Sequence, residues 1–439
     1  MKELDLALSI LNDDLDKDIY FADALRKVFT ENVDLRPLRA DVAGLLGCEL
    51  RHHLLFTYLL NPFTELSVEE KRIVMLGLAN NYFYRHFDGN TMIEAVKEKI
   101  GEEHFQMVQP LFDKVGQVDS FIPEHIEKHS NLYLSLRYNI PEWTLKIFQK
   151  EGNGAAYRTV RALSKPYVNY VRATRKIDPA SLGEDFAVTT IPDIFMYRGK
   201  IPLRKNEDYR MGKLFDERPY VKMIYDLMKV GDCENVLLYS SQIYPEWEKE
   251  LLESMSIHSN INIAVSDLNA KSSIQADIRK RNLKNVNLFE APNPDEMLSA
   301  ISKPCELVVV APQCSFFDRI ASSPDYLLHF NRETMNPIYA KQPQALMGCA
   351  KHVGIGGRLV YVLPTISQKE GHRVVAEFLR TNPEFSLDTE KQLLPSEELG
   401  VCFYYAILYK GEKAKVTDSA PIIEAFPQPS TNVSLAKAE

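Results

Sequence analysis

Six short apolar segments alternate with helical segments between residues 214 and 410, and this alternation constrains the fold more than any other feature of the sequence. The apolar segments read ENVLLYS, INIAVS, NVNLFE, ELVVVAP, RLVYVLP and CFYYAILYK, and stretches such as PEWEKELLESM, SSIQADIRKRN and HRVVAEFLRTN separate them. Short buried strands joined by helices build a doubly wound parallel sheet. We therefore expect a Rossmann-like α/β domain over 214–410, with any ligand at the carboxyl ends of its strands.

Residues 1–128 follow a helical pattern instead. Apolar residues recur at helical spacing in LDLALSILNDDL, FADALRKVF, GCELRHHLLFTYLL and EEKRIVMLGLANNYFY. Ser67 and Glu70 have the spacing of a capping box before the last of these segments. We expect an all-helical bundle here.

Residues 129–213 predict a small α+β module. PEWTLKIFQKEG and AAYRTVRALS are typical of helices, whereas YVNYVRATR and DFAVTTIPDIFMYRG are typical of strands. The last segment, 411–439, is small, polar and contains proline, which predicts a disordered tail. The chain is therefore expected to be a multidomain α/β protein.

The charge distribution distinguishes the small module from the rest of the chain. The whole chain has a formal net charge of -8, yet residues 131–213 contain 15 Lys and Arg against 8 Asp and Glu. Cations and aromatic residues alternate there, as expected of a surface that binds RNA phosphates and stacks on unpaired bases. The candidate RNA-binding residues are Arg158, Arg161, Lys165, Arg172, Arg175 and Lys176. An ordinary basic surface over core tyrosines is the alternative.

Several classes of protein are disfavoured. No stretch approaches 18 uninterrupted apolar residues, so we expect no membrane span, and the acidic N-terminus lacks the apolar core of a signal peptide. Six cysteines without CxxC spacing favour a reducing cytoplasm, no disulfide framework and no zinc site. His52 and His53 point about 100° apart on a helix, so a structural role is favoured over a shared metal.

Four segments carry a specific resemblance. They are YLSLRYNIPEWTLKIFQKEG with ALSKPYVNYVRATR, then LFDERPYVKMIYDLMKVG, SSPDYLLHF, and KQPQALMGCAKHVGIGGRLVYVLPTISQKEGHRVVAEFLRTNPEFSL. Together they resemble bacterial RNA cytosine-5 methyltransferases, most closely the type that methylates 16S rRNA and is called B. The resemblance covers about residues 1–410. It implies a NusB-like N-terminal domain, an RNA-binding module and a Rossmann-like domain that binds S-adenosylmethionine.

The cofactor turn departs from that family's pattern. The family reads VLDLCAAPGGKT, whereas the same register here reads VLLYSSQIYPEW. Leu238 replaces the acidic residue, and Tyr244 and Pro245 replace two glycines that let the backbone approach the cofactor. We expect Tyr244, Pro245 and Trp247 to fill or displace the cofactor site.

Glycine is missing well beyond this turn. The 116 residues between Gly231 and Gly348 contain none, and they cover the first four strands of the expected sheet. Two acidic residues nevertheless keep the family's places. The resemblance implies that Asp267 would bind the ribose and that Glu290 would lie near the cofactor, although an aspartate at a strand end is also a common helix cap.

The catalytic positions depart as well. The family's DAPCS motif reads APQCS here, so Ala311 replaces the aspartate that holds cytosine, and Cys314 falls on the cysteine that assists product release. A cysteine in this position can also be a small apolar residue. Pro364 occupies the place of the cysteine that attacks cytosine, and proline has no nucleophile. Gly356, Gly357 and Glu370 keep the family's residues, which places the register to within about one residue.

The leading hypothesis is a catalytically degenerate relative of the rRNA cytosine-5 methyltransferases that still binds structured RNA. In that case S-adenosylmethionine is not bound. One alternative is an active methyltransferase with altered residues, in which Cys314 is the only familiar thiol. Another is a protein-interaction scaffold that does not bind RNA.

Overall fold

The computed structural model describes residues 1–114, 116–151, 156–164, 168–189, 191–241, 246–266, 268–292, 301–330, 332–395 and 402–411. The chain forms two compact units. The helical unit comprises Met1–Pro166, Asp318–Met335 and Pro395–Val401. The sheet unit comprises Tyr167–Phe317, Asn336–Leu394 and Cys402–Glu439.

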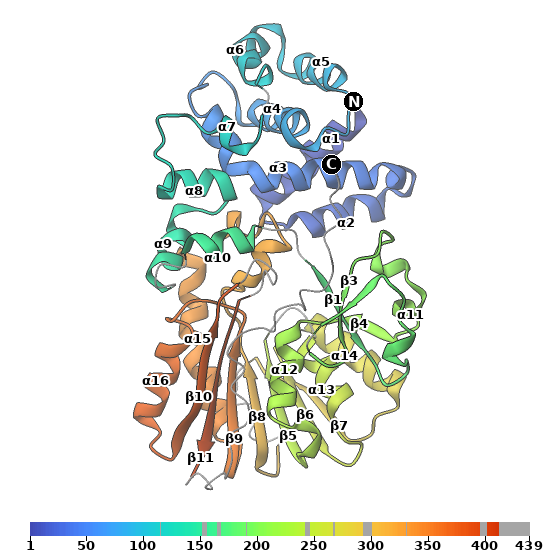
Figure 1. Cartoon of the computed structure of the whole chain (residues 1–439), viewed down its shortest axis with the longest axis vertical. Helices are drawn as coiled ribbons and strands as arrows, with labels where there is room; N and C mark the ends of the chain where they lie inside the picture. Colours follow the sequence, from blue (N-terminus) through green and yellow to red (C-terminus); the bar gives the residue numbers. More distant parts are fainter. Residues whose placement is uncertain are drawn as a thin grey trace. The chain divides into compact units, whose positions relative to one another are not determined.

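In the described residues, the helical unit begins at the N-terminus and continues through ten α-helices, one 3₁₀-helix and one π-helix (Figure 1). These are α1 (Lys2–Lys17), α2 (Phe21–Glu31), η1 (Val33–Leu38), α3 (Arg39–Leu60), α4 (Val68–Ala79), η2 (Asn80–Tyr84), α5 (Gly89–Ile100), α6 (Glu102–Phe112), α7 (Val118–Phe121), α8 (Asn131–Tyr138), α9 (Glu142–Glu151) and α10 (Ala156–Leu163). The helices expected from the apolar spacing are all present.

Local sequence explains where α4 begins. The Ser67 hydroxyl accepts from the Glu70 amide at 3.2 Å, and the Glu70 carboxylate accepts from the Ser67 amide at 2.8 Å. This reciprocal arrangement satisfies two donors at the start of the helix, as the sequence predicts. Most of the residues that follow in α4 are buried, so the helix lies inside the helical unit.

A second part of the helical unit comes from far along the chain. The 3₁₀ turns η7 (Phe317–Ala321) and η8 (Tyr326–Leu328) and the beginning of α15 (Arg332–Ala350) provide Asp318–Met335 of this unit. The segment therefore follows a strand of the sheet unit in sequence but packs with the helices.

The sheet unit contains a small antiparallel sheet with the order β2-β3-β1-β4. The strands are β1 (Asn169–Ala173), β2 (Phe186–Val188), β3 (Ile194–Tyr197) and β4 (Leu214–Asp216). Its small core includes Val171, Phe195 and Leu214. The module expected over 129–213 is thus divided, because α8, α9 and α10 belong to the helical unit and the strands belong to the sheet unit.

The larger sheet has seven strands in the order β10-β11-β9-β8-β5-β6-β7 (Figure 1). The strands are β5 (Asn235–Ser240), β6 (Asn260–Val265), β7 (Val286–Glu290), β8 (Cys305–Ala311), β9 (Val353–Leu363), β10 (Phe385–Leu393) and β11 (Phe403–Lys410). Strands β7, β6, β5, β8 and β9 are parallel, whereas β11 is antiparallel to both of its neighbours. The expected Rossmann-like sheet is confirmed.

Helices connect these strands. They are α12 (Pro219–Leu227), α13 (Glu246–Ser254), α14 (Leu268–Arg281), α15 and α16 (His372–Thr381). Strand β10 was not expected from the sequence, because its polar residues hide the alternation of an edge strand. The tail expected at 411–439 lies, except for Gly411, outside the described residues. None of the described helices combines the length and apolar character needed to cross a membrane.

Candidate functional site at the carboxyl edge of the sheet

The strand order reverses between β5 and β8, and this point is where doubly wound sheets bind ligands. At their carboxyl ends Ser240 of β5 is paired with Ala311 of β8. The Ser241 amide then donates to the Ala311 carbonyl at 3.1 Å. The end of β9 lies beside β8, so the carboxyl ends of β5, β8 and β9 together mark the candidate site.

A buried carboxylate joins the loops after β8 and β9. Glu370 accepts from the Ser315 amide at 2.7 Å, from the Ser315 hydroxyl at 2.6 Å and from the Thr365 hydroxyl at 2.8 Å. The amide of Gln342 in α15 donates to the same carboxylate at 3.0 Å. All four residues are fully buried, so these contacts hold the two loops in one fixed register.

The electrostatics of this network follow from its burial. Removal from water raises the pKa of Glu370, while the hydrogen bonds from Ser315 and Thr365 act in the opposite direction. The Tyr361 hydroxyl donates to the Glu370 carbonyl at 3.1 Å and ties the network to β9. Because the donors surround the carboxylate, Glu370 serves to position the loops.

Cys314 and Pro364, the two positions that the sequence resemblance singled out, lie at this edge. Cys314 follows β8 and is fully buried, and its Sγ accepts from the Phe316 amide at 3.3 Å. Pro364 directly follows β9, one residue before the Thr365 that binds Glu370. Pro364 therefore lies at the carboxyl edge of the sheet, next to the network that Glu370 forms.

Sequence reasoning missed a second thiol at the same edge. Because β11 runs antiparallel to β9, Tyr404 pairs with Leu363 and the start of β11 lies at the carboxyl end of β9. Cys402 directly precedes this start and is fully buried. The Gln392 amide bridges the Thr365 and Phe403 carbonyls at 2.8 and 3.1 Å. The position of Cys402 at this edge depends on the antiparallel direction of the last strand, and the spacing of residues in the sequence does not reveal that direction.

The expected cofactor residues are only partly described. Residues 242–245, which include Tyr244 and Pro245, and Asp267 lie outside the described residues. Leu238 is fully buried in β5, and its side chain has no polar group that could bind a cofactor. Glu290 ends β7, and its carboxylate accepts from Lys271 Nζ at 2.6 Å, an ion pair that occupies the side chain.

Trp247, expected to fill the cofactor site, lies in an aromatic cluster with Tyr220, Tyr225 and Phe403. Its ring centroid is 5.5 Å from that of Tyr225 and 6.4 Å from that of Phe403, and the Tyr225 hydroxyl donates to its carbonyl at 3.0 Å. Tyr220 and Phe403 stack at 4.2 Å. The cluster therefore links the first turn of α13, which follows β5, to the start of β11 on the other side of the switch point.

A buried glutamate, also missed from the sequence, lies in the same turn. Glu248 of α13 is fully buried, and a side-chain hydrogen bond with Ser240 only partly offsets the effect of burial on its carboxyl group. Burial raises its pKa to about 7. Chemically, such a carboxyl group can exchange a proton near neutral pH. The charged neighbours of Glu248 in EWEKELLES are typical of an exposed helix, so the local pattern does not predict its burial.

The candidate RNA-binding residues are distributed over both units. Arg158 and Arg161 are exposed on α10 of the helical unit, and Arg175 and Lys176 are exposed after β1 of the sheet unit. Lys165 lies outside the described residues.

Arg172 differs from the other candidates because it is buried. Its Nε donates to Glu250 at 3.0 Å and its Nη1 lies 2.9 Å from Asp193, and its side chain is only 8% exposed. The alternation of YVNYVRATR does not show which face of β1 is covered. Arg172 therefore stabilises the sheet unit and does not contribute to an exposed basic surface.

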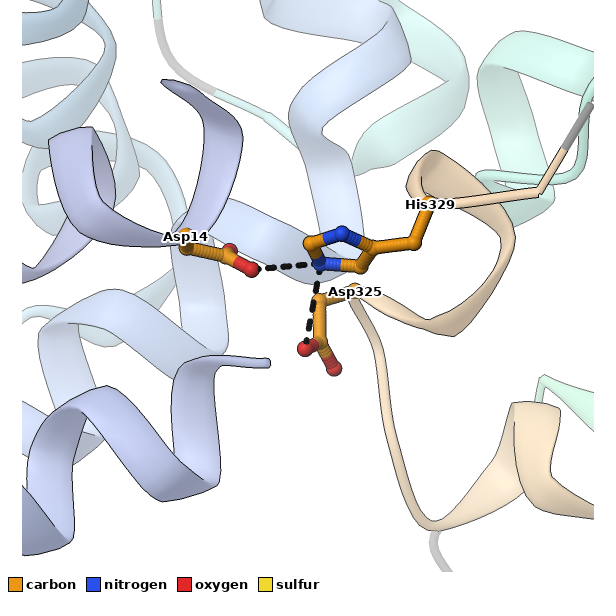
Figure 2. Close-up of side chains that lie close together, drawn as sticks. All are labelled: Asp14, Asp325 and His329. Carbon is orange, nitrogen blue, oxygen red and sulfur yellow. Dashed lines mark hydrogen bonds and ion pairs between the residues drawn. The ribbon is translucent and has the colours of Figure 1, made fainter. Parts of the chain in front are cut away.

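A separate cluster in the helical unit has the residue types of a metal site. Figure 2 shows Asp14 of α1 facing His329, with Asp325 below the ring. Their ligating atoms all lie within 4.8 Å of one another. His329 Nε2 is 2.6 Å from Asp14 Oδ1, and its Nδ1 is 2.6 Å from Asp18 Oδ1.

These contacts favour an ion-paired imidazolium. Burial alone would lower the pKa of His329, but the hydrogen bonds of its ring nitrogens to carboxylates outweigh burial and raise the pKa to about 10. A nitrogen that carries a proton cannot ligate a metal. Asp325 is occupied as well, since it accepts from the Phe21 amide at 2.9 Å.

The adjacent histidines His52 and His53 have different partners. His53 binds Glu49 at 2.7 Å, whereas His52 stacks on Phe83 with ring centroids 3.9 Å apart.

Three solved structures resemble the chain over most of their own length. The protein PH0851 superimposes with a TM-score of 0.72 and 15% identity, covering 93% of this chain and 99% of that one. A methyltransferase homolog protein from Pyrococcus horikoshii gives 0.54 and 15%, covering 65% and 100%. The chain has a methyltransferase fold.

A third structure, NSun6 from Pyrococcus horikoshii with SFG, gives a TM-score of 0.53 at 11% identity and covers 62% of this chain and 99% of that one. The sequence itself matches no protein-family model and no curated protein. At these identities the likeness concerns the fold alone. It agrees with the expected Rossmann-like domain, and the function to propose is argued from the residues of the chain.

Proposed function

We propose that the chain is an RNA-binding relative of the RNA cytosine-5 methyltransferases that has lost methyl transfer, with a helical unit of the NusB type and rRNA as its partner. The observation that carries the proposal is Pro364 at the carboxyl end of β9, in a register supported by the contacts of Glu370 with Thr365 and Ser315. Covalent attack on cytosine needs a thiol at that point.

The surroundings of the cofactor turn add to the proposal. The indole of Trp247 and the apolar side chain of Leu238 are buried at and after β5, where a cofactor-binding relative has polar contacts. RNA binding is supported by the exposed cations Arg158, Arg175 and Lys176, because RNA affinity arises largely from phosphate neutralisation.

Calorimetry with S-adenosylmethionine, run beside RNA-binding titrations at several salt concentrations, tests this proposal. We expect no cofactor binding and an RNA affinity that falls steeply as salt rises. A micromolar dissociation constant for S-adenosylmethionine would overturn the loss of methyl transfer. Absence of RNA binding at low salt would overturn the RNA-binding function and favour the scaffold.

A second candidate is a methyltransferase with an altered nucleophile. Cys402 favours it, because the antiparallel course of β11 places this residue at the end of the sheet where β9 ends and Pro364 follows. Cys314 at the end of β8 would then assist product release. Incubation of the protein with RNA and labelled S-adenosylmethionine distinguishes the candidates: label transfer that is lost in Cys402→Ser and retained in Cys349→Ser would establish this one.

A further inference from the structure

The helical unit contains a cavity of about 300 Å³, which is near the lower limit for sites that bind small molecules. Its apolar walls include Val118, Leu163 and Ile320. Its polar residues include Arg51, Arg137 and Tyr138. An apolar cavity with a few polar groups is the usual composition of a site for a small organic ligand.

Asn139 fixes the walls of this cavity relative to one another. Its amide donates to the Leu50 carbonyl at 2.6 Å and lies 3.5 Å from the Pro324 carbonyl, while its Oδ1 accepts from the Leu54 amide at 2.9 Å. Asn139 has a φ of 55° at the end of α8, a conformation that asparagine tolerates better than most residues. One side chain therefore joins α3, α8 and the segment after η7, so the cavity is a preformed feature of the unit.

The charge of the cavity favours an anionic ligand. Arg51 is exposed, its Nη1 donates to the Gly47 carbonyl at 3.0 Å, and no carboxylate pairs with it among the described residues. Arg137 is ion-paired with Asp119, so it is largely neutralised. The cavity therefore has one uncompensated cation at its margin, which suits a single phosphate.

Aromatic rings continue from the cavity to the surface. Tyr138 donates to the Tyr157 hydroxyl at 3.3 Å, and the two rings meet edge to face with centroids 6.2 Å apart. Tyr157 is 37% exposed and also contacts the ring of His129 at 5.6 Å. Arg158, the next residue on α10, is exposed. Aromatic rings flanked by cations are the usual means of binding unpaired bases.

The cavity also offers an unused polar atom. His52 lines it, and its buried Nδ1 has no hydrogen-bond partner within the described part of the chain. Burial and the nearby charge of Arg51 lower the pKa of His52 to about 4, so the ring is neutral at physiological pH. A neutral imidazole can accept or donate one hydrogen bond to the edge of a base.

We infer that this cavity holds one unpaired nucleotide of the RNA, with the base between the apolar walls beside Tyr138 and a phosphate on Arg51. The inference rests on the proposed RNA-binding function and specifies where the protein recognises single-stranded RNA. It predicts a preference for RNA that contains unpaired nucleotides, because a paired base inside a helix cannot enter a cavity.

The test compares a hairpin that has an unpaired loop with a fully paired duplex of the same stem, using the full-length chain. We expect Tyr138→Ala and Arg51→Ala each to weaken hairpin binding about tenfold, the loss typical of one stacked base, and to leave duplex binding unchanged. Tyr138→Phe keeps the ring and should bind as the wild type does. Thermal unfolding of each variant identifies any loss caused by misfolding.

Ser164→Trp provides an independent variant, because it fills the cavity from an exposed position without removing a charge. It should also weaken hairpin binding selectively. If the wild type binds hairpin and duplex but these variants bind both as the wild type does, the inference is overturned and the proposed function stands. If the wild type binds neither RNA, the proposed function itself fails.

Discussion

The Nε2 atom of His329 lies 2.6 Å from Oδ1 of Asp14, although 315 residues separate them in the chain. The two side chains are almost completely buried, with 5% and 1% exposed. A charged pair of this kind is costly to break, because the remaining partner keeps a buried charge without compensation.

Because of this pair, the helical unit should lose stability at alkaline pH. The pKa of His329 in the folded state, about 10, is higher than its ordinary value of 6.5. Its contribution is therefore fully present below about pH 6.5 and is lost as the pH rises through about 10. We expect His329→Gln to lower the free energy of unfolding by about 3 kcal/mol at pH 6 and by much less at pH 11.

Denaturant unfolding at both pH values measures this effect. His258→Gln is the matched control, because His258 is exposed and its backbone amide, rather than its ring, forms the hydrogen bond seen in the described part of the chain. An equal loss for His329→Gln at pH 6 and pH 11 would contradict the ion-pair assignment.

Metal removal should leave the same cluster unaffected. If Asp14, Asp325 and His329 form an ion-paired network, a strong chelator will not change the unfolding temperature of the purified protein, and added zinc at neutral pH will not raise it. Differential scanning fluorimetry with and without chelator provides the measurement. A stabilisation that increases with zinc concentration and disappears in Asp14→Asn would show that the cluster is a metal site.

Glu248 predicts a loss of stability at a lower pH. Burial raises its pKa from 4.5 to about 7, so the folded state binds the proton more tightly than the unfolded state does. The wild type should lose stability as the pH rises from about 4.5 to about 7. Glu248→Gln removes this loss, so its stability relative to the wild type should increase by roughly 3 kcal/mol between pH 4 and pH 8.

Chemical denaturation across this pH range provides the comparison. Glu98→Gln is a suitable control, since Glu98 is exposed on α5. A relative stability of Glu248→Gln that stays constant with pH would indicate that the carboxyl group ionises normally.

The basic residues around β1 should separate into two classes. Arg172→Ala leaves the buried Glu250 without its ion-pair partner and should reduce the free energy of unfolding by about 3 kcal/mol. Arg175→Glu with Lys176→Glu changes exposed residues only. This double variant should unfold like the wild type but bind RNA more weakly. The slope of log affinity against log salt should become shallower by about 0.7 for each phosphate that the protein no longer neutralises. Unchanged RNA binding would show that the exposed residues after β1 do not contact RNA.

Many of the helices and strands could be predicted, because apolar runs and capping residues in the local sequence determine them. Buried runs such as ELVVVAP and INIAVS became β8 and β6, and the capping box of Ser67 and Glu70 begins α4 as expected. β10 was missed because an edge strand needs polar residues, and those residues conceal its periodicity.

The candidate site was less predictable, because it depends on contacts between distant segments. Pro364 could be placed by its register, but the burial of Arg172 depends on Glu250, which lies 78 residues later. Cys402 reaches the carboxyl edge only because β11 pairs antiparallel with β9. Neither relationship has a local signature in the sequence.

The contribution of Asp318–Met335 to the helical unit has a consequence for synthesis on the ribosome. Domains generally fold in order from the N-terminus as the chain emerges. Here the ion pair of Asp14 cannot form before His329 has been synthesised. The helical unit therefore cannot complete its packing until the strands up to β8 have been made. A chain truncated at Pro166 would lack this segment, and we expect the nascent helices to rely on chaperones or the ribosome surface during that interval.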